Sequence, residues 1–412
     1  MAILRHPGPL PRWLWLTLAV PDPPTNGQFL YSKGLIQAAA SAGVSLDIVA
    51  LGRPYDAPQH KIADGLHRWW IAHDPPRSRW ASLVSPLPHM ANMANTRAMR
   101  RHLLDQLAAA EGQDAGWDAI VFDSLAAAWA QRDVLAAIER ARRRPALIYL
   151  AHNHESSVAQ RVAAIHPHPV KRQINRADAL KVGRLERSLA AGADLITANS
   201  PEDCALFRRD YPDKPVRCLR PVFVGTPVLS RRIGPDVPRR AVMLGSYDWL
   251  PKRLNLVEFL HAADPLFAAA GVELQVIGAA KPAFIAQLRR TVRATTFTGP
   301  VDDPAPYLAA ARLGVIAERV GGGFKLKTLD YVFNRVPVAA LAGTMPGMPL
   351  RDADTAVISP DAAALARRVI DLIDDFSALN RMQVRAYQAC RGVFDLAAGG
   401  RSLLAAVSHA TP

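Results

Sequence analysis

Short apolar runs alternate with longer amphipathic stretches along the first half of the chain. The short runs predict buried strands, because they are rich in Val, Ile, Leu and aromatic residues and are bounded by turn residues. They cover Trp13–Val20, Val44–Leu51, His67–Ala72, Asp118–Phe122, Ala146–Ala151 and Leu195–Ala198. The amphipathic stretches predict helices at Gln28–Ala42, Met93–Ala110 and Lys171–Ala191. Such alternation indicates a parallel, doubly wound α/β sheet.

The alternation stops at Arg220–Arg240 and then starts again. Prolines punctuate this basic stretch, which we interpret as an interdomain linker. The strands expected after it are Ala241–Gly245, Glu273–Gly278, Thr295–Thr298, Leu313–Ala317 and Val336–Leu341. A last helix, Leu403–His409, has no strand to pair with. We therefore predict two Rossmann-like domains, 1–225 and 226–385, and a C-terminal helical segment, 386–412, that could pack back on the first.

Length and charge narrow the class of protein. At 412 residues the chain exceeds what one core usually supports, and 50% hydrophobic and 21% charged residues are typical of a globular protein. The net charge of +14 indicates anionic partners such as nucleotides or lipid headgroups, although arginine enrichment from a GC-rich genome explains part of it. No apolar run is long enough to span a membrane. No nucleic-acid partner is expected, because the basic residues do not alternate with aromatic ones.

The cysteines suggest a reducing compartment. Cys204, Cys218 and Cys390 are scattered and form neither a disulfide framework nor a metal-ligand pattern. A cytoplasmic location is therefore expected, with the inner face of the cell membrane as a peripheral alternative. Asp302 and Asp303 adjoin each other, but they are typical of a turn, and no metal ligands are predicted.

The most informative segment follows the predicted strand Leu313–Ala317 and reads Gly321-Gly322-Gly323-Phe324-Lys325-Leu326-Lys327-Thr328-Leu329-Asp330. A strand, a glycine loop and a helix can hold phosphate, because the backbone comes close and the helix start offers free N–H groups. Lys325 and Lys327 add positive charge, and Asp330 is an acceptor suited to ribose hydroxyls. Together they fit a nucleoside diphosphate. A plain tight turn with solvated lysines is the alternative, since this is neither a dinucleotide fingerprint nor a Walker loop.

Other candidate residues also follow predicted strands, which is where open α/β sheets bind ligands. Gly27 lies in the loop after the first strand, and His152 follows the strand Ala146–Ala151. Gly245–Arg253 follows the first strand of the second half.

Two acidic residues near these strand ends have simpler explanations. Asp123, together with Ser124, is expected to cap a helix, or else to orient the hydroxyls of an acceptor. Glu155 is expected to cap the helix that follows His152.

In their order along the chain, these motifs resemble those of glycosyltransferase family 4, which has the GT-B fold. Leu150-Ala151-His152-Asn153-His154-Glu155-Ser156 is similar to the family's His-Asn-x-Glu-Ser variant. Leu244-Gly245-Ser246-Tyr247-Asp248-Trp249-Leu250-Pro251 resembles the start of the donor domain in one subgroup. Thr298-Gly299-Pro300-Val301-Asp302-Asp303 resembles the Gly-x-Val-x-Asp turn, and Gly321–Leu329 with Pro337-Val338 the donor-binding motif.

The resemblance implies two facing Rossmann-like domains with a cleft between them, the first for an acceptor and the second for a nucleotide sugar. It implies transfer of a sugar to an acceptor hydroxyl with retention and without a cofactor, in polysaccharide or cell-envelope glycan assembly. A UDP- or GDP-linked donor and a glycan or lipid-linked acceptor are expected, with an anionic membrane surface as a further partner. His152 and Lys327 would be catalytic. The donor would be bound by Gly27, Gly245, Ser246, Lys252, Arg253, Gly322, Gly323, Phe324, Lys325 and Asp330.

The chain departs from the family's pattern at three positions. Asp330 stands where Glu is common, and Ser246 stands where Arg is typical. The first acid of the family's paired-Glu motif has no clear match, although Glu318 lies nearby. Two alternatives therefore stay open: a sugar-nucleotide epimerase of GT-B fold, and a protein that binds nucleotide sugars without turnover.

Overall fold

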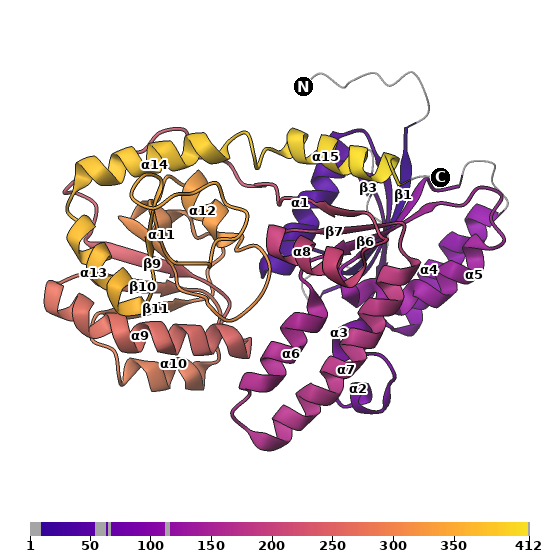
Figure 1. Cartoon of the computed structure of the whole chain (residues 1–412), viewed down its shortest axis with the longest axis horizontal. Coiled ribbons are helices and arrows are strands. Elements are labelled where there is room, and N and C mark those ends of the chain that lie inside the picture. Colours follow the sequence, from indigo (N-terminus) through magenta and orange to yellow (C-terminus); the bar gives the residue numbers. More distant parts are fainter. Residues whose placement is uncertain (1–9, 54–62, 65–66, 112–115, 411–412) are drawn as a thin grey trace. The chain divides into compact units, whose positions relative to one another are not determined.

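A computed structural model of the chain describes residues 10–53, 63–64, 67–111 and 116–410. The described part forms two compact units (Figure 1). The first contains the chain up to Pro24, Gln28–Val222 and the residues from Leu396 on. The second contains Thr25–Gly27 and Phe223–Asp395. Each unit has its own sheet and its own hydrophobic core.

Within the described residues, the sheet of the first unit has eight strands in the order β3-β4-β2-β1-β5-β6-β7-β8. The strands are β1 (Arg12–Ala19), β2 (Ser45–Leu51), β3 (Ala63–Asp64), β4 (His67–Ala72), β5 (Ala119–Asp123), β6 (Ala146–Ala151), β7 (Leu195–Ala198) and β8 (Val216–Cys218). Neighbours pair in parallel except β3 and β4. Every residue of β5, β6 and β7 is buried, which is why these strands read as continuous apolar runs.

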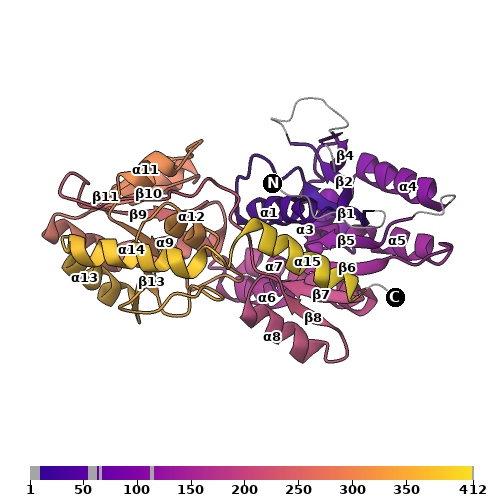
Figure 2. The same cartoon turned by 90° about the horizontal axis from the view of Figure 1, so that it is seen from above.

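Helices cover this sheet, and the last one comes from the end of the chain. They are α1 (Gly27–Ser41), α2 (Ala81–Val84), α3 (His89–Ala94), α4 (Arg97–Glu111), η1 (Leu125–Ala130), α5 (Gln131–Ile138), α6 (Glu155–Ile165), α7 (Pro169–Gly192), α8 (Pro201–Asp210) and α15 (Leu396–Ser408). A Cβ atom at Gly400 would collide with the Ala38 carbonyl oxygen, so this glycine lets α15 lie against α1 (Figure 2).

The second unit, fully described over residues 223–395, has a six-stranded parallel sheet in the order β11-β10-β9-β12-β13-β14. The strands are β9 (Arg240–Leu244), β10 (Glu273–Ile277), β11 (Thr295–Gly299), β12 (Leu313–Ile316), β13 (Val338–Leu341) and β14 (Ala356–Ser359). Its helices are α9 (Leu250–Ala270), α10 (Pro282–Arg289), α11 (Ala305–Ala309), α12 (Lys327–Phe333), α13 (Ala362–Leu372) and α14 (Phe376–Cys390). Helix α9 packs beside α13, and α12 packs beside α14 (Figure 1).

The predicted fold class is confirmed, with two corrections to individual helices. The helix expected over Met93–Ala110 is broken into α3 and α4, because the Thr96 hydroxyl accepts a hydrogen bond from the Met99 N–H at 3.2 Å and caps a new helix. The helix expected over Leu403–His409 begins earlier, at Leu396. Among the described residues, no helix is both long and apolar enough to cross a membrane.

Candidate functional site

Each sheet has one point where the strand order reverses, and the predicted residues gather near these points. In the second unit β9 lies between β10 and β12, so the chain leaves β9 toward one side and β12 toward the other. Ligands of doubly wound sheets bind where such loops diverge. The loop after β9 carries Gly245 and Ser246, and the loop after β12 carries Gly322 and Gly323. In the first unit the same relationship joins β1 and β5.

A cluster of three lysines and one glutamate lies beside the glycine loop of the second unit. Lys327 Nζ is 2.5 Å from Glu318 Oε1, and both side chains are largely buried. Burial alone would raise the pKa of Glu318, but attraction to Lys327, Lys252 and Lys325 outweighs it and lowers this pKa to about 2. Three cations thus surround one anion, and the surplus positive charge favours a further anion beside them.

The pKa of Lys252, another lysine of this cluster, is lowered. Burial is the main cause that lowers its pKa, and repulsion from Lys327 and Lys325 adds to it, whereas Glu318 opposes the change. An anion bound next to Lys252 would restore its ordinary pKa, so anion binding and the charge of this lysine support each other.

The glycine loop is held in place by hydrogen bonds to its backbone. The Asn255 side chain donates to the Val320 carbonyl at 2.7 Å and accepts from the Val320 N–H at 3.0 Å. Gly321 and Gly323 have φ angles of 138° and 65°, which other residues rarely adopt. Lys325 Nζ donates to the Gly322 carbonyl at 2.9 Å. The loop is therefore preformed, and one predicted donor-binding lysine folds back on it.

Asp330 and Phe324 occupy different environments. Asp330 lies one turn into α12, and among the described residues no hydrogen bond to its carboxyl group is found. Burial raises the pKa of Asp330 to about 6, and the nearby charge of Lys327 offsets this only in part. The ring of Phe324 is buried, with its centroid 5.5 Å from that of Phe394, so it packs inside the unit.

The loop after β9 brings a buried hydroxyl near Glu318. Within the described chain the Tyr247 hydroxyl is buried without a hydrogen-bond partner. Burial raises the pKa of Tyr247 well above its usual value, and the Glu318 charge raises it further. Gly245 donates its N–H to the Ile277 carbonyl at 3.0 Å, and Ser246 is half-buried beside it.

Arg253 is not part of the cluster of three lysines and Glu318. Its guanidinium stands over the ring of Phe284, 5.9 Å from the centroid. Gly27, the first residue of α1, follows β1 and is grouped by its contacts with the second unit.

The first unit holds a buried imidazole paired with a carboxylate. His152 Nε2 is 2.6 Å from Asp123 Oδ1, and Trp15 Nε1 donates to Asp123 Oδ2 at 3.0 Å. Burial would raise the pKa of Asp123, but attraction to His152 and hydrogen bonds from His152, Trp15 and Ser32 together lower it. Ser124 caps η1 by accepting from the Ala126 N–H, so Asp123 is free for His152 instead. Sequence reasoning had missed this pair.

The other nitrogen of His152 is the more informative one. The side chain is 6% exposed, and its Nδ1 is buried without a hydrogen-bond partner among the described residues. The ring is fixed by an edge-on contact with Tyr31, whose centroid is 5.0 Å away. A buried nitrogen without a partner is costly, so a ligand that supplies one would be stabilised.

The residues after His152 are structural, and one prediction about them is wrong. Glu155 does not cap α6; the Glu186 carboxylate accepts from the N–H groups of Glu155 and Ser156, each at 2.8 Å. Glu186 reaches this position from α7, which packs along α6. Burial raises the pKa of Glu155 to about 8, and hydrogen bonding from Asn153 opposes this.

The second unit matches a known family. Residues 238–375 match the family described as "Glycosyl transferases group 1". No curated protein matches the sequence of the chain. Among the described residues, no group of three or more His, Cys, Asp or Glu side chains is placed to hold a metal ion.

Solved structures with the same fold extend over nearly the whole chain. Sucrose-phosphate synthase from Thermosynechococcus elongatus is 16% identical with a TM-score of 0.70, over 97% of this chain and 98% of that one. Anabaena Alr3699/HepE in complex with UDP and glucose is 13% identical with a TM-score of 0.61, over 96% and 99%. WaaG, a glycosyltransferase involved in lipopolysaccharide biosynthesis, is 15% identical with a TM-score of 0.62, over 96% and 99%. The fold is therefore GT-B.

Proposed function

We propose that this chain is a retaining family 4 glycosyltransferase that transfers a sugar from a nucleotide-sugar donor to a hydroxyl of a glycan or lipid-linked glycan. The similarity to WaaG supports a role in polysaccharide or cell-envelope assembly. A UDP- or GDP-linked sugar is the proposed donor, and the HepE complex with UDP and glucose supports the former.

The single observation that carries the donor assignment is the surplus of positive charge beside the glycine loop. A nucleoside diphosphate gains negative charge as the sugar leaves, and preorganised cations stabilise that charge. We assign this role to Lys327, with Lys252, Lys325 and the loop glycines Gly322 and Gly323 beside it. Among the described residues, Glu318 is the acid that pairs with Lys327, and the charges of Lys327, Lys252 and Lys325 together outweigh its own.

We assign the remaining donor contacts mainly to residues of the loop after β9 and of α12. Asp330 is proposed to accept hydrogen bonds from the ribose hydroxyls, since among the described residues no hydrogen bond to its carboxyl group is found. Backbone groups of Gly245 and Ser246, and the cations Lys252 and Arg253, are proposed to contact the diphosphate. Gly27 is proposed to contact the donor through its backbone N–H. Phe324 acts by packing, because its ring is buried in the unit.

His152 is proposed to contact the transferred sugar through its unpaired Nδ1. Asp123 holds the ring by its other nitrogen and stabilises a positive charge on it, as carboxylates do for catalytic imidazoles. In the reaction the bond from the sugar's anomeric carbon to the diphosphate breaks. A bond to the acceptor oxygen forms on the same face, and the hydroxyl proton leaves with the departing phosphate.

A lipid-linked acceptor would require the enzyme to reach a membrane surface. The first unit has exposed apolar side chains that suit contact with such a surface. Trp80, Leu83, Val84 and Leu180 are 78%, 47%, 90% and 66% exposed. Lys181 Nζ donates to the Ser82 carbonyl at 2.8 Å and thereby joins α7 to α2. We call these four apolar residues the exposed apolar patch.

Basic residues flank Leu180, the member of the exposed apolar patch that lies on α7. Arg176 and Arg184 lie four residues to either side of Leu180 on α7, so all three share one helix face. In the described part of the chain neither arginine makes an ion pair. An apolar centre with arginines beside it suits an anionic lipid surface.

Acceptor-dependent turnover tests the proposed function. The purified chain is incubated with UDP- and GDP-linked sugars, with and without glycan and lipid-linked acceptors, and nucleoside diphosphate release is measured. Release that requires an acceptor, with the product keeping the donor's anomeric configuration by NMR, supports the proposal. Conversion of the nucleotide sugar without acceptor would indicate the epimerase alternative and overturn it.

Donor binding is measured separately by thermal shift. A nucleotide sugar at 100 times its Kd should stabilise the native state by about 2.7 kcal/mol. A protein stabilised by the donor but inactive with every acceptor class tried would count against a glycan acceptor.

A further inference from the structure

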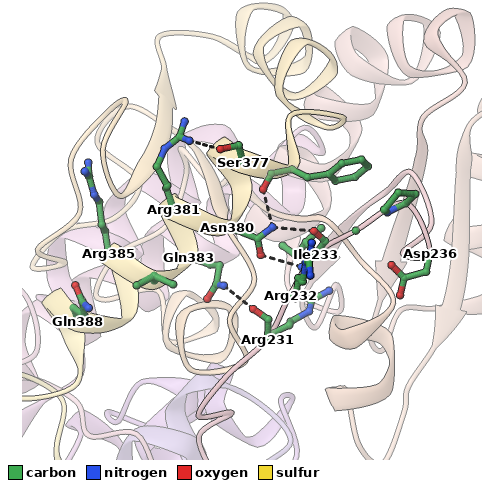
Figure 3. Close-up of a pocket in the computed structure, with 14 residues that line it drawn as sticks. Arg231, Arg232, Ile233, Asp236, Ser377, Asn380, Arg381, Gln383, Arg385 and Gln388 are labelled. Carbon is green, nitrogen blue, oxygen red and sulfur yellow. Dashed lines mark hydrogen bonds between the residues drawn. The ribbon is translucent and has the colours of Figure 1, made fainter.

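A pocket of the second unit is lined by arginines and shares no lining residue with the lysine cluster. It lies between the segment Arg231–Asp236 and helix α14, and its volume is about 1080 Å³ (Figure 3). Its charged side chains are one acid, Asp236, and four arginines: Arg231, Arg232, Arg381 and Arg385. A pocket of this size admits a molecule larger than a single phosphate ion.

The walls of the pocket are tied together by hydrogen bonds between segments far apart in the sequence. Asn380 Nδ2 donates to the Ile233 carbonyl at 2.8 Å, and the Ile233 N–H donates back to Asn380 Oδ1 at 2.9 Å. Gln383 Nε2 donates to the Arg231 carbonyl at 2.9 Å. Because both walls are fixed before any ligand arrives, little ordering free energy is spent on binding.

Within the described residues, three of the four arginines of the pocket make no ion pair, and Arg385 is the exception. Among the described residues, the hydrogen-bond acceptors of the Arg231 guanidinium are the carbonyl oxygens of Ala309, Ala311 and Arg335. Burial lowers the pKa of Arg231 to about 10, and no acid opposes this change. Arg231 is partly buried, and a partly buried cation without a counter-charge gains from an anion nearby.

The other arginines differ in whether their guanidinium groups already have a hydrogen-bond or ion-pair partner. Arg381 contacts the Ser377 hydroxyl, and Arg232 is exposed and makes no ion pair in the described residues. Arg385 pairs with Asp354 at 2.5 Å, but both side chains are about half exposed, so water weakens this pair. Figure 3 shows Asp236 at the opposite end of the pocket from Arg385.

We propose that this pocket binds a small phosphate-bearing ligand at a site separate from the donor site. All the cations are arginines, and the planar guanidinium fork matches the geometry of phosphate oxygens with two parallel hydrogen bonds. Asn380, Gln383 and Gln388 line the same pocket and supply neutral groups for the rest of the ligand. The phosphate is carried by a soluble molecule or by a lipid headgroup, since both present the same oxygens.

Inorganic pyrophosphate is the probe for the soluble case. Calorimetric titration is carried out on the full chain carrying Lys327→Ala, which weakens the donor site. Adding Arg232→Gln and Arg381→Gln should weaken pyrophosphate binding at least tenfold. Both side chains are exposed, so the fold is expected to persist. The matched control removes two exposed arginines of the same unit, Arg289→Gln and Arg290→Gln, and should leave the affinity unchanged.

Vesicles distinguish a lipid headgroup from a soluble phosphate. Co-sedimentation with phosphatidylglycerol and phosphatidylcholine vesicles is measured for the same two arginine pairs. Loss of phosphatidylglycerol binding in the pocket pair alone assigns the site to a lipid headgroup, whereas loss of pyrophosphate binding alone assigns it to a soluble ligand. If the pocket pair behaves like the control pair in both assays, the proposal is overturned.

Discussion

Lys327 and Glu318 are in direct contact inside the second unit, with Nζ and Oε1 2.5 Å apart. The contact holds the lysine at the start of α12, where the glycine loop ends. A salt bridge that is already formed fixes the ammonium group before the proposed donor binds. The same pair also sets a limit, because Glu318 cancels part of the charge that a diphosphate would otherwise meet.

Replacing Lys327 should slow turnover without unfolding the protein. Lys327→Ala is expected to lower kcat about 10²-fold, the effect of removing one charge-stabilising donor from a transition state. Steady-state kinetics with a saturating donor measure it. Lys281→Ala, which removes an exposed lysine of the same unit, is the control and should be neutral. Unchanged kcat in Lys327→Ala would remove this residue from the mechanism.

Replacing Glu318 should destabilise the free protein and strengthen its response to the donor. Glu318→Gln leaves Lys327 and Lys252 buried without their shared counter-charge, at a cost of about 3 kcal/mol. A nucleoside diphosphate would restore the missing negative charge, so its thermal shift should be larger in Glu318→Gln than in the wild type. The control is Glu273→Gln, whose pair with Arg240 is more exposed and contributes less than about 1 kcal/mol. An equal ligand shift in both variants would contradict this account.

Donor affinity should fall in mildly acidic solution because of Asp330. Its pKa of about 6 means that the carboxylate protonates as the pH falls from 7 to 5 and then accepts fewer hydrogen bonds. Affinity for the nucleoside diphosphate should drop by up to about tenfold per pH unit below 6. Calorimetry at several pH values measures this, and Asp330→Asn should lose the part of the pH dependence that the ligand's own phosphate does not cause.

Lowering the pH has the opposite effect on the stability of the protein: it should weaken donor binding but strengthen the contribution of Asp330 to stability. The folded pKa of Asp330 lies above its unfolded value, so between about pH 4 and 6 the folded chain binds more protons than the unfolded chain. The contribution of Asp330 to the free energy of unfolding therefore falls as the pH rises through this window. Asp330→Asn should be more stable than the wild type at pH 7 and closer to it at pH 4.

The sequence was most informative where burial is complete. Strands such as Ala146–Ala151 and Leu313–Ile316 lie inside their sheets, so their residues are apolar without interruption. The break at Asn95–Thr96 was missed because a single hydroxyl decides it, while the apolar spacing runs on across the break. Strand β14, at the edge of its sheet, was missed because its short apolar run resembles a loop.

Pairs within the site were harder to predict than the segments that carry them. Asp123 and His152 are 29 residues apart, and they meet because Asp123 lies opposite Leu150 in the parallel register of β5 and β6. That register was the available signal, since both residues follow adjacent strands. Glu318 was given no role because its spacing relative to the paired-Glu motif is ambiguous, yet the glycine loop brings Lys327 back to it.

The His152–Asp123 pair predicts effects on both rate and acid stability. His152→Ala is expected to lower kcat at least about tenfold with little change in donor affinity, since the imidazole is proposed to act on the sugar and not on the nucleotide. Asp123→Asn should lower the free energy of unfolding at pH 7 by about 2 kcal/mol, because it weakens buried charge-assisted hydrogen bonds. Kinetics and chemical denaturation measure the two effects.

The pH dependence of this pair provides its control. The folded pKa of Asp123 is lowered, so the stability that its carboxylate contributes is present above the unfolded pKa and is lost as the pH falls through the folded one. The difference between the wild type and Asp123→Asn should therefore shrink as the solution becomes strongly acidic. A difference that stays constant with pH would show that shape, not charge, is responsible.

Binding to anionic vesicles should depend on the arginines that flank the exposed apolar patch. Each basic residue near an anionic surface contributes about 1 kcal/mol, so Arg176→Gln with Arg184→Gln should reduce partitioning about 30-fold. Trp80→Ser should reduce binding at any salt concentration, whereas the arginine effect should fade at high salt, because ions screen charge but not apolar burial. Co-sedimentation at low and high salt measures both, with Arg289→Gln and Arg290→Gln as the charge-matched control. Equal binding to anionic and neutral vesicles, or none to either, would contradict the proposed binding to an anionic membrane surface. The enzyme would then have to bind its acceptor in solution.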